Sequence, residues 1–172
     1  KSGSEFYPFA VEAGKLVYDY VDTAQALVRL QKIGVAAPQS VEGQSAMSIV
    51  LDTLAKSEDW PGLYEASSKA LTISNWKDKD FIPKVKETNA DSFYRITLKT
   101  EAPEQILSRS KECVQRFSKS KIGIDCELLE ARTELKLAHY EQAEALLSSV
   151  MPKLKEPAKV QSLLLLRADA RS

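Results

Sequence analysis

The sequence predicts an all-α fold: an α-solenoid of about four antiparallel helix hairpins that ends in an unpaired helix. Ala, Leu, Glu, Lys and Arg make up 78 of the 172 residues, with only six Gly and seven Pro, a composition typical of helical proteins. Apolar residues recur at helical spacing along most of the chain, and no segment alternates as a β-strand does. The expected helix breaks recur about every 40 residues, which indicates stacked helical units.

Gly, Pro, Ser and Asp clusters mark where helices stop and start. Pro61 and Pro103 fit the first turn of a helix, where the missing N–H leaves no hydrogen bond unmade, and Asp59 fits a helix cap. We expect one domain, 1–172, which reads as a fragment of a longer protein. Its expected units are 3–38, 40–77, 79–119 and 121–153, followed by a partial unit over 156–172.

An aromatic or small residue stands just before each expected second helix. These residues are Tyr20, Trp60, Ala102 and Tyr140. A hairpin in such an array cannot bury its apolar face alone and does so against the next hairpin. We therefore expect the rings of Trp60, Phe117 and Tyr140 to be buried between units.

The best-defined turn is Leu-Ala-His-Tyr-Glu-Gln-Ala over residues 137–143. It resembles the turn of the tetratricopeptide repeat, which has a Leu, a small residue, any residue, an aromatic, two acidic or amide residues and an Ala. Ala138 stands where that family usually has Gly, and Leu63 of an earlier unit stands where it has Ala. The resemblance implies stacked helix hairpins that bind a protein or peptide. A different helical repeat or an irregular bundle is the alternative.

The segment Arg116–Ser120 is similar to the Phe-Pro-x-Ser joint of bacterial cell-envelope proteins built from this repeat, with Ser118 in place of the Pro. This similarity implies a periplasmic or cell-envelope location. A cytoplasmic location is the alternative.

Composition argues against several function classes. The 24 basic and 24 acidic residues balance, so the chain lacks the basic footprint expected of a nucleic-acid or anionic-membrane protein. The longest purely apolar run, Leu163–Leu166, is far too short to span a bilayer.

No pattern predicts catalysis, a metal site or a cofactor. His139 is the only His and is expected to be a solvated turn residue. The chain therefore has no His-Glu-x-x-His motif and no Cys/His cluster, and a Ser-His-Asp set could use only this one imidazole. The six Gly lie too far apart to form a phosphate loop. Acidic residues of one helix alternate with Arg132 and Lys136 as on a solvated helix surface. These acidic residues are Glu127, Glu130 and Glu134.

Cys113 and Cys126 face each other if the helices on either side of Lys119 and Ser120 are antiparallel. Free Cys is a common small core residue, so two buried thiols are the favoured interpretation. A disulfide is the alternative and would point to an oxidising compartment.

Binding is the remaining function. The first helices of stacked hairpins line a concave face that holds peptides. The residues expected to bind a partner there are Lys56, Tyr94, Leu98, Arg132 and Lys136, with Asp52 and Leu128 on the same face. The alternative is an assembly module that self-associates through exposed solenoid ends, at Phe6–Phe9 and Leu163–Leu166.

Overall fold

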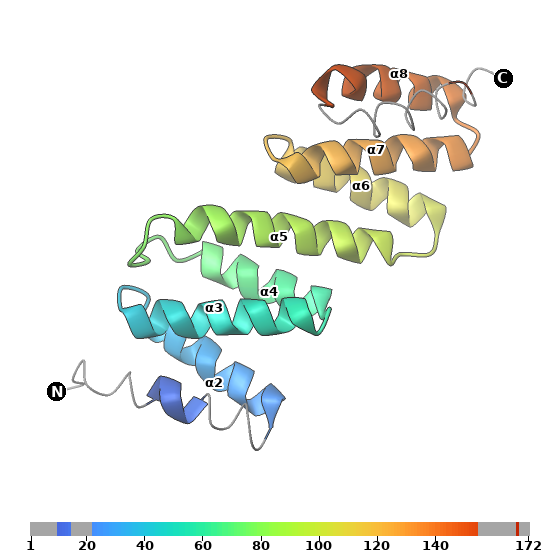
Figure 1. Ribbon diagram of the computed structural model, residues 1–172. Coiled ribbons are helices and arrows are strands. Elements are labelled where there is room, and N and C mark those ends of the chain that lie inside the picture. Colours follow the sequence, from blue (N-terminus) through green and yellow to red (C-terminus); the bar gives the residue numbers. More distant parts are fainter. Residues whose placement is uncertain (1–9, 15–21, 155–167, 169–172) are drawn as a thin grey trace. The chain divides into compact units, whose positions relative to one another are not determined.

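The computed structural model describes residues 10–14, 22–154 and 168 (Figure 1). Every regular element in these residues is a helix and none is a strand, which confirms the predicted all-α class. Short connections join consecutive helices. The labelled elements are α2 (Thr23–Ala36), α3 (Val41–Lys56), α4 (Trp60–Leu71), α5 (Phe81–Leu98), α6 (Pro103–Phe117), α7 (Lys121–Lys136), α8 (Tyr140–Val150) and the 3₁₀-helix η1 (Met151–Lys153).

The chain divides into two compact units, Lys1–Ser92 and Phe93–Ser172, with the boundary inside α5. In the first unit α2 packs on α3 and α3 packs on α4; in the second, α6 packs on α7 and α7 packs on α8. Each unit has its own apolar cluster. The first includes Leu30, Met47, Val50, Leu63, Trp76 and Phe81, and the second includes Leu128, Ala131, Leu147 and Val150.

Helix starts agree with the stop and start signals in the sequence. Asp59 caps α4 by accepting a hydrogen bond from the Gly62 N–H at 3.0 Å, as predicted. Pro61 lies in the first turn of α4 and Pro103 is the first residue of α6, so neither breaks a hydrogen bond inside its helix.

Two three-helix blocks match at an offset of 80 residues. The first block is residues 23–71 (α2, α3, α4) and the second block is residues 103–150 (α6, α7, α8). Their helices begin at Thr23 and Pro103, at Val41 and Lys121, and at Trp60 and Tyr140. The offset is two of the 40-residue intervals, since α3, α5 and α7 also begin 40 residues apart.

The turn between the second and third helix has the same conformation in both blocks. Glu58 has φ 54° and Ala138 has φ 61°, the only positive values among the described non-glycine residues. In the first block, the N–H groups of residues 58 and 59 donate to the carbonyls of residues 55 and 54. In the second block, the N–H groups of residues 138 and 139 donate to the carbonyls of residues 135 and 134. This left-handed helix end normally uses Gly. It explains why the repeat family that the turn resembles has Gly at the Ala138 position.

The turn between the first and second helix also repeats. Ser40 and Ser120 each accept a hydrogen bond from the N–H three residues on, at Gly43 and Gly123, and each Oγ donates to the carbonyl three residues back. A Cβ on either glycine would overlap a backbone carbonyl oxygen of the preceding helix end. Glycine is therefore required at both positions by close approach of the backbone.

We expect Ala138→Gly to stabilise the protein, because an L-residue in the left-handed region costs about 1 kcal/mol that Gly does not incur. The matched control is Ala145→Gly on the exposed face of α8, which should destabilise by about 1 kcal/mol. Urea unfolding followed by circular dichroism measures both. Destabilisation by both substitutions would contradict the turn geometry.

Two expectations about packing are wrong. Tyr140, the first residue of α8, is 51% exposed rather than buried between units. Leu128, expected on the binding face, is buried at 9% exposure, because it lies on the α7 stripe with Ala131 and Leu135 that packs in the apolar cluster of the second unit. Trp60 and Phe117 are half-buried, and Phe117 contacts Phe93 with ring centroids 5.8 Å apart. Tyr20 and the expected solenoid ends lie outside the described residues.

Candidate functional site

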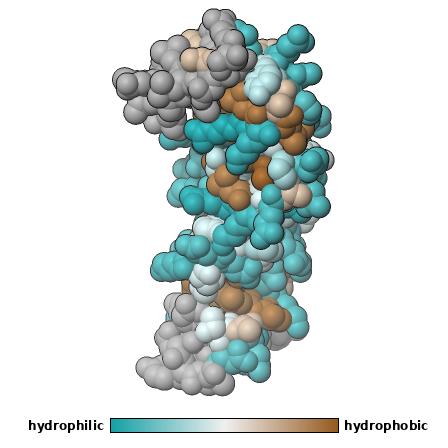
Figure 2. Space-filling model, turned by 90° about the vertical axis from the view of Figure 1, so that its right-hand side faces the viewer, coloured by the Kyte–Doolittle hydropathy of each residue, from teal (hydrophilic) through white to brown (hydrophobic). Residues whose placement is uncertain are grey.

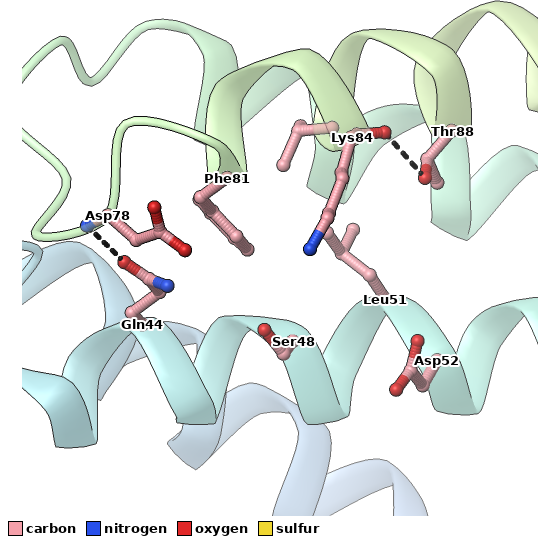
Figure 3. A pocket seen from close by; sticks show the side chains of 9 residues that line it. Gln44, Ser48, Leu51, Asp52, Asp78, Phe81, Lys84 and Thr88 are labelled. Atoms are coloured by element: carbon pink, nitrogen blue, oxygen red, sulfur yellow. Dashed lines mark hydrogen bonds between the residues drawn. The ribbon is translucent and has the colours of Figure 1, made fainter.

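The first unit contains a pocket of ≈ 210 Å³ between α3 and α5 (Figure 3). This volume is below the 300–1,000 Å³ typical of small-molecule sites and suits one or two side chains of a peptide. Three lining residues are apolar and buried: Leu51, Phe81 and Val85. The other lining residues are polar: Gln44, Ser48, Asp52, Asp78, Lys84 and Thr88.

Helical periodicity brings these residues together. Gln44, Ser48, Leu51 and Asp52 form one stripe on α3, and Phe81, Lys84, Val85 and Thr88 form another on α5. Figure 3 shows Phe81 and Lys84 extending from α5 toward α3.

The connection before α5 fixes one end of the pocket. Gln44 Oε1 accepts a hydrogen bond from the Asp78 N–H at 2.8 Å, and Asp78 Oδ1 accepts one from the Asp80 N–H at 2.9 Å. Trp76 is buried, donates through Nε1 to the Ala70 carbonyl at 3.0 Å, and contacts Phe81 with ring centroids 4.7 Å apart. The pocket wall is thus held by the core of the unit before any ligand binds.

The pocket is charged but not internally paired. Asp52 and Lys84 are exposed, and no ion pair joins either of them to another residue within the part of the chain that the structure describes. Both charges are therefore available to a polar or charged segment of a partner.

Of the residues predicted for the binding face, only Asp52 lines this pocket. Lys56 is exposed one helical turn beyond Asp52. At the offset of 80 residues, Arg132 and Lys136 occupy the positions of Asp52 and Lys56, and both are exposed on α7.

The two predicted residues of α5 lie beyond the unit boundary, in the second unit. Tyr94 is half-buried, and Leu98 is 46% exposed at the end of the helix. Sequence reasoning did not identify Phe81 and Lys84, although their spacing to Val85 and Thr88 is helical.

The second unit contains a polar cluster where a solvated surface was expected. Glu130 and Glu134 are buried, at 8% and 3% exposure, so the prediction of a solvated acidic face is wrong for both. Glu134 lies 3.2 Å from Lys111 Nζ, and its Oε2 is 2.7 Å from His139 Nδ1. They are buried because they lie on the face of α7 that packs on α6.

Environment shifts these two carboxyls in opposite directions. Burial raises the pKa of Glu130, and the charges of Glu134 and Glu127 add to this, against the opposing charge of Lys111. Burial also acts to raise the pKa of Glu134, but hydrogen bonds from His139 and Lys111 outweigh it, so this pKa is lowered.

Cys113 and Cys126 form a disulfide between α6 and α7, with Cα atoms 5.9 Å apart. The favoured interpretation of two buried thiols is therefore wrong, and the alternative holds. Packing of α6 on α7 brings the two Cα atoms to an ordinary distance for a disulfide, and both residues are 0% exposed.

Among residues 10–14, 22–154 and 168, no group of three His, Cys, Asp or Glu is placed to hold a metal ion. None of the helices in that part of the chain has the length and apolar character to cross a bilayer. No protein-family model, curated protein or solved structure matches this chain.

Proposed function

We propose that this chain is a non-enzymatic protein-interaction module that binds a peptide segment of a protein partner, with the α3–α5 pocket as its anchor point. The observation that carries this proposal is the pocket itself. It lies between α3 and α5, which are the first helices of the predicted units 40–77 and 79–119. In helical-repeat proteins such helices carry the binding face.

We also propose the type of repeat, namely antiparallel helix hairpins of the tetratricopeptide type that stack as a solenoid. The matching turns at Glu58 and Ala138 support it, because both place a left-handed residue where that family has Gly. The 40-residue spacing of α3, α5 and α7 supports it as well. The α5–α6 connection departs from the pattern, since no residue there has positive φ.

The form of the exposed surface agrees with a peptide partner. On the face drawn in Figure 2, apolar side chains are exposed in separate patches among hydrophilic ones. An extended peptide uses such a surface through a few anchoring side chains and many polar contacts. The solenoid ends of the assembly alternative lie outside the described residues, so no observation favours that alternative.

The test is a displayed library of random peptides selected on the whole protein, followed by affinity measurement on a pocket-filling variant. Ser48→Trp places a large ring at the pocket wall and should weaken binding of the selected peptides at least tenfold. The control is Ser45→Trp on the same helix, which is exposed and does not line the pocket, and should leave affinity within about twofold.

Equal affinity of the selected peptides for Ser48→Trp and for the parent would remove the pocket from the binding face. Failure to select any saturable binder would contradict the peptide-binding function. Both substitutions place a Trp on α3, which could itself unfold the helix. Circular dichroism spectra of the two variants check for such unfolding.

A further inference from the structure

The two blocks have the same helix layout but different chemistry at buried positions. In the first block, positions 30, 50 and 54 are Leu30, Val50 and Leu54, all part of the apolar cluster. Leu30 and Val50 are buried and Leu54 is half-buried, whereas at the offset of 80 the second block has the buried residues Ser110, Glu130 and Glu134. At these three positions, polar side chains of α6 and α7 therefore replace apolar side chains of α2 and α3.

The buried charges of Glu130 and Glu134 add little stability to the packing of α6 on α7. Glu130 has no hydrogen-bond or ion-pair partner within the described residues, and a buried carboxylate without one is costly. Glu134 has Lys111 and His139 as partners, but a buried ion pair roughly balances the desolvation of its charges. His139 contributes an ion pair only while its imidazole is protonated.

The disulfide lies next to this polar layer. Cys126 precedes Glu130 by one turn of α7, and Cys113 lies two residues after Lys111 on α6. At the offset of 80 these two positions are Ile33 and Ala46, apolar residues of the first unit that need no covalent bond. The disulfide thus lies beside the buried charged residues of this interface.

We propose that the α6–α7 pair is a redox-controlled element, in which the Cys113–Cys126 disulfide holds together a charged helix interface that opens when the disulfide is reduced near neutral pH. Reduction transfers two electrons to the S–S bond. A dithiol reductant supplies these two electrons and two protons, so that Cys113 and Cys126 become thiols. The reductant itself is oxidised to a disulfide.

Opening should depend on pH through Glu130. The charged groups that act on it are Lys111 from α6 and Glu127 and Glu134 from α7; Lys153 of η1 pairs with Glu127, and His139 pairs with Glu134. Since the pKa of Glu130 is raised above its ordinary value in the folded chain, the stability linked to its neutral carboxyl is fully present at pH below that ordinary value. As pH rises through that pKa, the buried charge forms and this stability is lost.

Native-state hydrogen exchange read by mass spectrometry tests the proposal on the whole chain, with α2 and α3 as the internal reference. The disulfide is removed by Cys113→Ser/Cys126→Ser and, separately, by a phosphine reductant on the unaltered chain. After correction for intrinsic exchange rates, protection of α6 and α7 at pH 8 should fall at least tenfold, while that of α2 and α3 changes less than about threefold. At pH 4.5, where Glu130 is less ionised than at pH 8, the loss should be smaller.

Adding Glu130→Val, which places at position 130 the residue found at the matching position 50, should restore most of the lost protection at pH 8. It should also reduce the pH dependence, leaving only the part that comes from the His139–Glu134 pair. Unchanged protection of α6 and α7 after disulfide removal would overturn the proposal. So would an equal loss at α2 and α3, which would mean global destabilisation, or a failure of Glu130→Val to restore protection.

Discussion

Trp76→Ala is expected to destabilise the protein by about 3–5 kcal/mol, the cost of deleting a large buried aromatic side chain. Trp76 is 6% exposed and lies in the connection between α4 and α5. Its loss also leaves the Ala70 carbonyl without the indole donor and Phe81 without its ring contact. Urea unfolding followed by far-UV circular dichroism gives the free energy, since tryptophan fluorescence changes with the substitution itself.

Tyr140→Ala is the matched control for that measurement. Tyr140 is 51% exposed, so we expect a loss of less than about 1 kcal/mol. The order of the two variants is what the structure determines. A larger loss for Tyr140→Ala than for Trp76→Ala would contradict the burial of both rings.

Val50→Glu is expected to destabilise the first unit by about 4 kcal/mol at pH 8, because it buries a carboxylate at a site with no disulfide nearby. Val50 is 2% exposed and occupies the position of Glu130. Burial disfavours ionisation of the introduced carboxyl relative to the unfolded chain, so the cost should be smallest in mild acid and grow as pH rises. Urea unfolding at pH 5 and pH 8 measures the difference.

Val50→Gln separates charge from size in this experiment. Its amide is polar but does not ionise, so its cost should be the same at pH 5 and pH 8. If the cost of Val50→Glu does not change with pH, position 50 tolerates a charge. That result would contradict the claim that the buried charge at the matching position 130 weakens the second unit.

The helices were predictable because their signals are local. The cap at Asp59, the prolines of α4 and α6 and the approximate 40-residue interval all agree with the structure. The match at an offset of 80 was not recognised, although Ser40 and Gly43 recur as Ser120 and Gly123, because the left-handed turns at Glu58 and Ala138 share no residue type. Left-handed backbone at a residue other than Gly leaves no clear signal in a sequence.

Burial of individual side chains was less predictable. Glu130 and Glu134 alternate with basic residues as a solvated face would, yet packing of α7 on α6 buries them. Tyr140 matches an aromatic motif position but is 51% exposed at the start of α8. For Cys113 and Cys126, the facing positions were apparent from the sequence, whereas the choice between thiols and a disulfide depends on the approach of two helices.

The pocket combines residues from α3, α5 and the connection before α5, so no single stripe indicates it. Asp52 was expected on the binding face from the alignment of the predicted units. Lys84, Phe81 and Asp78 join it only through the fold, because the hydrogen bond from the Asp78 N–H to Gln44 closes one end of the pocket.

Amide chemical-shift mapping of the ¹⁵N-labelled protein with the tightest library-selected peptide tests the central claim most directly. We expect saturable shifts concentrated at the pocket-lining residues of α3 and α5, among them Ser48, Asp52 and Lys84, and we expect these shifts to be lost in Ser48→Trp. Saturable shifts confined to other helices, with the pocket-lining residues unaffected, would contradict it.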